Sequence, residues 1–172
     1  MPLPFMHSDD DHPAVLVRPM TPADRAIITG LVVSVENFNQ AEIECALELV
    51  DIYLNDKKQT DYHVVVAEDT SSGVQAYACW GPVPLTRGTY DLYWIATHMN
   101  SRGRGFGRAL MDYVERKVLE HGGRLLVAET SSKSSYERTI EFYRGLGFNE
   151  ASRIGDFYDV GDDRLIFVKR LS

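Results

Sequence analysis

A glycine-rich segment between an expected strand and an expected helix constrains this chain most. Residues 102–107 read Arg-Gly-Arg-Gly-Phe-Gly. Residues 89–98 before them are rich in aromatic and β-branched side chains, as strands are. Residues 108–120 after them carry apolar side chains at helical spacing. A glycine-rich turn that leads into a helix exposes backbone N–H groups and the positive end of the helix dipole, so the segment predicts a phosphate-binding loop.

Two common nucleotide-binding loops do not fit this segment. The P-loop needs Lys and then Ser or Thr after its last glycine, where this chain has Arg108 and Ala109. The dinucleotide fingerprint needs a third glycine, but that position falls on Arg108 or Leu110, depending on the glycine from which the count begins. A tight turn whose glycines only let the backbone bend is the alternative to an anion site.

The pattern Arg102-x-x-Gly105-x-Gly107 resembles the Arg/Gln-x-x-Gly-x-Gly/Ala motif of the GNAT superfamily of acyl-CoA-dependent N-acyltransferases. An expected strand over 125–130 and a helix that ends near Phe142 and Tyr143 resemble the second half of the family pattern. The resemblance extends from about residue 15 to residue 171. It implies that this chain is an acyltransferase, with acetyl-CoA as its co-substrate.

The resemblance also implies where coenzyme A binds. The expected pyrophosphate site comprises Arg102, Gly103, Arg104, Gly105, Phe106, Gly107 and Arg108. In the family the fourth and fifth strands splay apart, and the pantetheine arm lies in the gap. The backbone of Ile95, Ala96 and Thr97 is then expected to hydrogen-bond that arm as an added strand would.

Hydrophobic periodicity and turn residues predict the element order β-α-α-β-β-β-α-β-α-β-β. The expected strands are 14–18, 62–68, 74–80, 89–98, 124–130, 151–158 and 164–171, and the expected helices are 21–35, 40–55, 107–120 and 136–145. Residues 1–13 are interpreted as a flexible tail, and residues 14–172 as one GNAT domain. The predicted fold is α/β, with a GNAT-type mixed, mostly antiparallel central sheet of about seven strands and helices on both faces.

Composition excludes several classes of protein. Of the 172 residues, 44% are hydrophobic and 25% are charged, as in ordinary globular domains. No stretch approaches the roughly 20 apolar residues of a membrane span, and the first residues do not have the pattern of a secretory signal. The net charge of −7 argues against nucleic acid as the main partner and favours a cationic amine. A homodimer is compatible with the sequence.

The two cysteines, Cys45 and Cys79, show no metal-binding spacing. We interpret them as small buried side chains in a reducing cytoplasm, which predicts a cytoplasmic enzyme without a bound metal. No cysteine lies near the glycine-rich motif to act as a nucleophile, so the sequence favours direct transfer of the acyl group.

Acetyl transfer from a thioester to an amine requires that the ammonium loses a proton, and it is helped by protonation of the leaving thiolate. By the resemblance, the hydroxyl of Tyr143 points at the thioester sulfur and is the acid. The alternative is a half-buried aromatic on an amphipathic helix, because tyrosine is often buried with its hydroxyl bonded.

Two carboxylates are candidates for the base. Glu129 lies at the end of the fifth strand, where family members that acetylate protein N-termini carry a glutamate. Asp91 lies eleven residues before the first arginine of the motif, an offset at which histone-acetylating members have their base. A carboxylate inside an apolar strand is costly to bury unless it is paired or functional. Strand alternation is expected to place four residues on one face, namely Asp91, Tyr93, Ile95 and Thr97. Of the two, the sequence favours Glu129 slightly over Asp91.

The expected acceptor site is lined by Phe38, Trp80, Tyr93 and Phe157. Aromatic and acidic side chains suit an amine on a small apolar or cationic body. Where the family has an asparagine that contacts pantetheine, this chain has Tyr136. The sequence thus predicts an N-acetyltransferase that moves acetyl to a primary amine of a small molecule. A non-catalytic acyl-CoA-binding sensor and a protein N-terminal or lysine acetyltransferase are the alternatives.

Overall fold

The computed structural model describes residues 15–172, so the expected tail over 1–13 lies outside the described residues. The strands are β1 (Leu16–Pro19), β2 (His63–Asp69), β3 (Gly73–Pro82), β4 (Thr89–Thr97), β5 (Leu125–Ser131), β6 (Asn149–Asp159) and β7 (Asp162–Arg170). The helices are α1 (Arg25–Val33), α2 (Gln40–Asn55), α3 (Phe106–Glu120) and α4 (Glu137–Gly145), with short 3-10 turns at Pro22–Asp24, Met99–Ser101 and Ser134–Tyr136. The predicted order of elements is confirmed.

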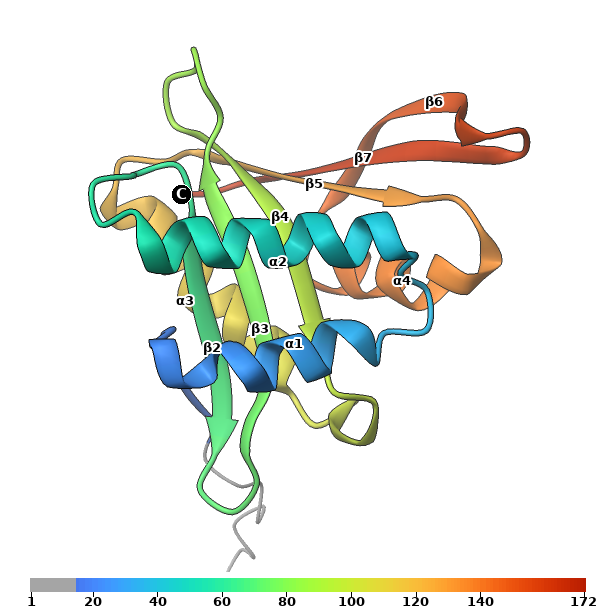
Figure 1. Ribbon diagram of the computed structural model, residues 1–172. Helices are drawn as coiled ribbons and strands as arrows, with labels where there is room; N and C mark the ends of the chain where they lie inside the picture. Colours follow the sequence, from blue (N-terminus) through green and yellow to red (C-terminus); the bar gives the residue numbers. More distant parts are fainter. Residues whose placement is uncertain (1–14) are drawn as a thin grey trace, which may run out of the picture.

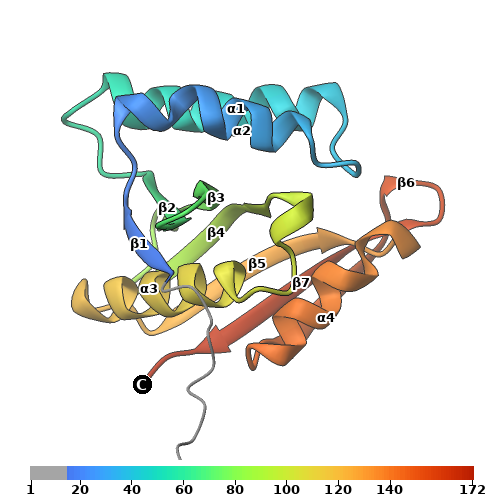
Figure 2. The ribbon, with the colours of Figure 1, turned by 90° about the horizontal axis from the view of Figure 1, so that it is seen from below.

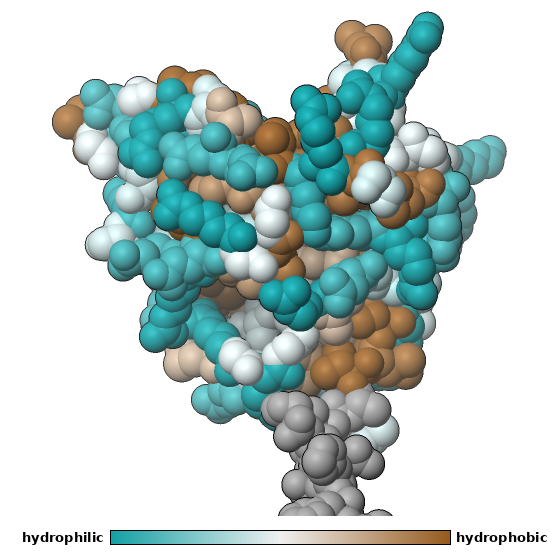
Figure 3. Space-filling model, turned by 180° about the vertical axis from the view of Figure 1, so that it is seen from behind, coloured by the Kyte–Doolittle hydropathy of each residue, from teal (hydrophilic) through white to brown (hydrophobic). Residues whose placement is uncertain are grey.

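The seven strands form a single sheet in the order β1-β2-β3-β4-β5-β7-β6. All neighbouring pairs are antiparallel except β4 and β5, which are parallel. Helices α1 and α2 cover one face of the sheet and α3 and α4 cover the other, as Figures 1 and 2 show. Each face has its own hydrophobic core. The predicted mixed, mostly antiparallel sheet with helices on both faces is confirmed. On the side seen in Figure 3, polar residues separate smaller groups of hydrophobic ones.

Strands β4 and β5 stay paired over only part of their length. Their register joins residues 89–92 to residues 125–128 and then ends. Beyond that point β4 continues beside β3 to Thr97, while β5 continues beside β7 to Ser131. The two strands therefore diverge, which is visible in Figure 1, and this is the gap that the family resemblance predicted.

A β-bulge in β4 changes which side chains share a face of the sheet. Leu92 lies opposite Trp80 and Trp94 lies opposite Cys79, so Tyr93 is the extra residue. Leu92 and Ile95 pack in the core beneath α3, although regular alternation would place them on opposite faces. Tyr93 packs in the core beneath α1 and α2. Asp91, the neighbour of Leu92 on its other side, also points away from Leu92 and therefore lies on the same side as Tyr93.

The expectation of one shared face for Asp91, Tyr93, Ile95 and Thr97 is therefore wrong. The extra residue shifts the alternation by one position, so Ile95 lies on the α3 side and Asp91 on the α1 side. Thr97 also lies on the α3 side, because its Oγ1 is 3.8 Å from the position that a Cβ on Gly107 would take. The bulge thus places the side chains of Ile95 and Thr97 on the opposite side of the sheet from the candidate base Asp91.

Helix α2 begins at Gln40, as predicted, because a reciprocal pair of hydrogen bonds caps it. The side chain of Asn39 accepts from the backbone N–H of Glu42 at 3.0 Å, and the Glu42 carboxylate accepts from the Asn39 N–H at 2.7 Å.

One cysteine departs from the expected burial. Cys79 is buried in the sheet, but Cys45 is exposed, because α2 turns Ala46 and Val50 toward the core instead.

A buried carboxylate ties the start of α1 to the sheet. Arg18 on β1 donates to both oxygens of Asp24, at 2.8 and 3.0 Å, and also to Glu68 on β2. Asp24 accepts two further hydrogen bonds from Thr21, and only 6% of its side chain is exposed. The Arg18 hydrogen bond and the two from Thr21 lower the pKa of Asp24 to about 2.

We expect Asp24→Asn to lower the free energy of unfolding by about 2 kcal/mol at pH 7, because it leaves the guanidinium underpaired. The pKa of Asp24 is lower in the folded protein than in the unfolded chain, so its contribution is complete above about pH 4 and disappears toward pH 2. Urea unfolding at pH 7 and pH 3 measures both effects. Asp51→Asn is the control, since it removes a half-exposed partner of Arg25 and should cost less than about 1 kcal/mol. Equal losses for the two variants would contradict the prediction.

Candidate active site

The glycine-rich loop offers a continuous run of backbone donors. Gly103 and Gly105 have φ of 76° and 88°, in the left-handed region that favours glycine, and Gly105 caps α3. The first backbone hydrogen bond of α3 runs from the N–H of Ala109 to the carbonyl of Gly105, at 3.0 Å. Within residues 15–172, the six preceding N–H groups, from Gly103 to Arg108, have no hydrogen-bond acceptor. Six such donors at a helix N-terminus fit a pyrophosphate.

The side chains of this loop have different surroundings. Phe106 is buried in the core, so it offers the site only its backbone. Gly107 lets α3 approach α4 closely, because a Cβ there would lie 3.1 Å from the ring of Phe142. Arg108 donates to the carbonyl of Gly145 at 3.4 Å. Only some of the predicted loop side chains are therefore available to an anion.

The two other arginines of the loop, Arg102 and Arg104, are exposed at its surface. Arg104 forms an ion pair with Asp69 at 3.2 Å, and its guanidinium carbon lies 5.4 Å from the centre of the Phe106 ring. Its charge is thus partly compensated by a residue outside the loop.

The edge of β4 beyond the gap has a partner on one side. Ile95, Ala96 and Thr97 lie opposite Ala78, Tyr77 and Ala76 of β3. In the described part of the chain no strand pairs with their other edge, because β5 has already diverged. Backbone N–H and C=O groups on such an edge can hydrogen-bond an extended amide-containing chain.

Tyr143 lies in the core on the α3 and α4 side of the sheet. Its ring packs against Phe142, Phe148 and Phe167, with centroid distances of 5.5 to 5.7 Å. Burial raises the pKa of its hydroxyl well above the usual value, so the group is neutral and can donate a proton at pH 7.

The two candidate bases lie on the opposite side of the sheet and close together. Glu129 follows the last residue of β5 that pairs with β4, and it forms an ion pair with Arg164 of β7. Burial, and secondly the nearby charge of Glu129, raise the pKa of Asp91, while Arg164 offsets part of this effect. The structure thus brings both carboxylates to the α1 side of the gap, one paired and one with a raised pKa.

Three of the four predicted acceptor-site residues come from different elements, and one of them contacts the partner of Glu129. Tyr93 forms an edge-to-face pair with Tyr62, at 5.4 Å between ring centroids. Phe38, in the α1–α2 loop, packs edge-on against Trp94 at 5.1 Å. The guanidinium of Arg164 lies 4.8 Å over the ring of Phe157. The cation that pairs with Glu129 therefore also contacts an expected substrate-binding residue.

The structure corrects the expectation for Trp80. Its side chain is 2% exposed and stacks on His63 at 4.4 Å, in the core beneath α3. Trp80 lies opposite Leu92 and faces the same side of the sheet, away from Asp91. Because the strand register shifts between Cys79 and Trp80, simple alternation along the strands does not indicate which face Trp80 takes.

Sequence reasoning did not anticipate a link between two loops beside the gap. The hydroxyl of Tyr136 donates to the carbonyl of Asn37 at 2.9 Å, and the Asn37 side-chain amide donates to the carbonyl of Ser135. Tyr136 therefore contacts the α1–α2 loop. The partners are almost one hundred residues apart, and no local pattern indicates such a contact.

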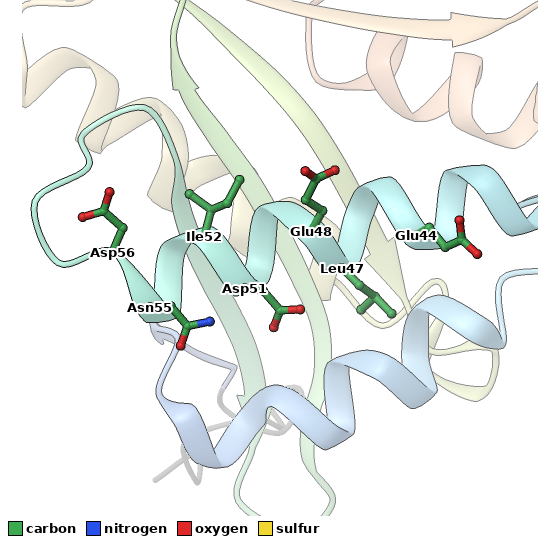
Figure 4. A pocket seen from close by; sticks show the side chains of 7 residues that line it. All are labelled: Glu44, Leu47, Glu48, Asp51, Ile52, Asn55 and Asp56. Carbon is green, nitrogen blue, oxygen red and sulfur yellow. The ribbon is translucent and has the colours of Figure 1, made fainter.

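A hollow of about 680 Å³ lies along α2 and is shown in Figure 4. All seven lining residues belong to α2 or its C-terminal cap, and four of them are acidic: Glu44, Glu48, Asp51 and Asp56. None of them is a predicted site residue. Within residues 15–172, no group of three or more potential ligands is placed to hold a metal ion, and no helix is both long and apolar enough to cross a membrane.

The Acetyltransferase (GNAT) domain family model matches residues 60–150 of this chain. A crystal structure described as an acetyltransferase of the GNAT family from Desulfovibrio desulfuricans is 39% identical, with a TM-score of 0.87, over 92% of this chain and all of the other. YncA of Salmonella typhimurium, solved with acetyl-CoA, is 20% identical with a TM-score of 0.70, over 92% of this chain and 95% of the other.

The ribosomal-protein-S18-alanine N-acetyltransferase of Escherichia coli has the same fold, at 19% identity and a TM-score of 0.72, over 92% of this chain and 95% of the other. At this identity the likeness shows the fold alone. Because the family model spans more than half of the chain and the Desulfovibrio protein matches along nearly all of it, the chain belongs to the GNAT superfamily and is an acetyl-CoA-dependent acyltransferase.

Proposed function

We propose that this enzyme moves the acetyl group of acetyl-CoA directly to a primary amine of a small molecule. The observation that carries the proposal is the divergence of β4 and β5, because the candidate coenzyme A-binding groups and the candidate bases lie on opposite sides of the sheet there. The free loop amides and Tyr143 lie on the α3 side, and Asp91 and Glu129 lie on the α1 side. The two substrates would then meet in the gap from opposite faces of the sheet.

On the α3 side, the N–H groups of residues 103–108 would bind the pyrophosphate, and the edge of residues 95–97 would bind the pantetheine arm. Acetyl-CoA supplies the thioester whose C–S bond breaks as the C–N bond forms. Holding both substrates in the gap would supply much of the rate acceleration. Tyr143 is the proposed acid, which donates its proton to the leaving sulfur.

On the α1 side, we favour Asp91 over Glu129 as the base, which reverses the ranking from sequence. Glu129 is paired with Arg164, and taking up a proton would break that ion pair. Asp91 makes no hydrogen bond to another side chain within residues 15–172, and its raised pKa suits it to accept the ammonium proton. Glu129 and Arg164 would then set the charge around Asp91.

The link between Tyr136 and Asn37 supports a small acceptor, because it joins the α1–α2 loop to the segment after β5 beside the proposed acceptor side. The acidic residues there favour a cationic body. The names of the fold neighbours include both protein and small-molecule acetyltransferases, among them an aminoglycoside 6'-N-acetyltransferase. These neighbours do not choose between the acceptor classes.

The test is release of free thiol from acetyl-CoA in the presence of amino acids, polyamines, aminoglycosides and short peptides. Turnover with small amines and none with peptides is the expected result. Turnover with peptides alone would replace the small-molecule proposal by protein acetylation. If no compound in the panel gives thiol release, while acetyl-CoA still raises the melting temperature, the result would favour a non-catalytic sensor.

Tyr143→Phe should lower kcat by about a hundredfold, the usual scale for loss of a general acid, and leave the KM for acetyl-CoA within about twofold. The ring keeps its packing, because only the hydroxyl is removed. Tyr113→Phe, on a half-buried tyrosine of α3, is the control and should leave both constants unchanged. An equal fall in kcat and in acetyl-CoA affinity would assign Tyr143 to packing instead.

A further inference from the structure

The β2–β3 hairpin contacts both the glycine-rich loop and the segment just before it. Before the loop, the hydroxyl of Ser101 donates to the side chain of Gln75 at 2.7 Å, and the N–H of His98 donates to the Gln75 carbonyl at 2.7 Å. Within the loop, Arg104 pairs with Asp69. Two segments about thirty residues apart in sequence are thereby held together.

Hydrogen bonds within the β2–β3 turn hold the Asp69 side chain, independently of its ion pair with Arg104. Its side chain is fully buried, and its Oδ1 accepts from the N–H and hydroxyl of Ser71 and from the N–H of Ser72, at 2.5 to 2.9 Å. These bonds, that of Ser72 first, lower the pKa of Asp69 to about 2. The turn thus occupies one oxygen and presents the other, Oδ2, to Arg104 at 3.2 Å. Asp69 is a charged and rigid anchor.

Arg104 is the residue between the two glycines of left-handed conformation, Gly103 and Gly105. Glycine has the largest conformational freedom of any residue, so a loop of this kind is costly to order on binding. The guanidinium of Arg104 pairs with Asp69 and lies over the ring of Phe106. An anchor at this position restricts both neighbouring glycines.

We propose that Asp69 is a positioning residue for coenzyme A, which acts through Arg104 to hold the loop amides in the conformation that binds the pyrophosphate. Arg104 is accordingly an internal support of the loop, and the helix N-terminus and its N–H groups bind the phosphates. This inference rests on the proposed assignment of the loop to the pyrophosphate. It adds a residue on a different hairpin to the coenzyme A site.

The competing interpretation gives the opposite result. If Arg104 binds a phosphate directly, Asp69 competes with the ligand for the same guanidinium. Removing the Asp69 charge would then leave coenzyme A affinity unchanged or strengthen it. If Asp69 positions the loop, the same substitution weakens binding.

The experiment is calorimetric titration of coenzyme A into the wild type, Asp69→Asn, Arg104→Met and the double variant. Methionine is an unbranched side chain that removes the charge and the guanidinium. We expect each single variant to bind about tenfold more weakly, within the range found for residues that support a binding site. The double variant should bind no more weakly than either single one, because both remove the same contact. Arg116→Met, on the same α3 helix, is the control and should bind normally.

Two further measurements separate positioning from direct contact. Arg104→Lys keeps a cation that can reach Asp69, so it should recover part of the lost affinity. The dependence of affinity on salt concentration should be the same for wild type and Arg104→Met, because the arginine contributes no phosphate contact. Unchanged or tighter binding by Asp69→Asn, or a shallower salt dependence in Arg104→Met, would overturn the inference. Arg104→Met leaves the hydrogen bonds of the β2–β3 turn intact, so it remains informative if Asp69→Asn fails to fold.

Discussion

Gly105→Asp is expected to abolish coenzyme A binding, with a loss of at least about a hundredfold in affinity. Gly105 caps α3 and stands among the six N–H groups proposed to bind the pyrophosphate. A carboxylate there would place a negative charge against the phosphates and would itself accept hydrogen bonds from the loop N–H groups. Calorimetric titration with coenzyme A measures the loss, and the melting temperature without ligand reports whether the fold survives.

The matched control is Gly105→Asn. No atom outside the adjacent residues lies within 4 Å of a Cβ placed on Gly105, so both side chains have room. Asparagine and aspartate tolerate positive φ better than other residues do, and the two differ mainly in charge. The asparagine variant should therefore keep measurable binding. Normal affinity in Gly105→Asp would remove the loop from the coenzyme A site. Loss in Gly105→Asp with normal binding in Asp69→Asn would overturn only the positioning role of Asp69.

The order and type of the elements could be predicted because local signals agree with the fold. The start of α2 is an example, since Asn39 and Glu42 are three residues apart and cap each other. The glycine loop is another, because the left-handed conformations of Gly103 and Gly105 are ones that glycine alone adopts without strain. In both places the residues that decide the conformation are close in sequence.

The faces of β4 could not be predicted, because no residue in the strand signals the bulge at Tyr93. The extra residue is defined only by the pairing with β3, where Trp80 and Cys79 lie opposite Leu92 and Trp94. A count along β4 therefore placed Asp91 and Ile95 on one face, and it could not show that Trp80 faces the α3 core. Strand register depends on partners that a local pattern does not contain.

Long-range ion pairs could not be predicted from the sequence either, and one of them is the basis of our proposed choice between the two candidate bases. Arg164 lies on β7, thirty-five residues after Glu129, and pairs with it across the sheet. Sequence position alone favoured Glu129. Burial, and secondly the charge of Glu129, raise the pKa of Asp91, and together with the Glu129–Arg164 pair this is why we propose Asp91 as the base.

Asp91→Asn should lower kcat/KM for the acceptor amine by about a hundredfold to a thousandfold at pH 7, the usual scale for loss of a general base. Glu129→Gln should cost less than about tenfold, because Glu129 is proposed to act only through the charge near Asp91. Steady-state thiol release with an amine that is turned over by the wild type measures both. Near-normal affinity for coenzyme A in the two variants would show that the cofactor side is undisturbed.

The pH dependence gives a second and independent measurement. Asp91 accepts a proton only when it is ionised, so kcat/KM should fall as the pH drops through its raised pKa. Glu129→Gln removes a negative charge that raises this pKa and leaves the positive charge of Arg164, which lowers it. The acidic limb of the profile should therefore move to lower pH in Glu129→Gln and disappear in Asp91→Asn. If the acidic limb instead disappears in Glu129→Gln and persists in Asp91→Asn, then Glu129 is the base and Arg164 is its modulator.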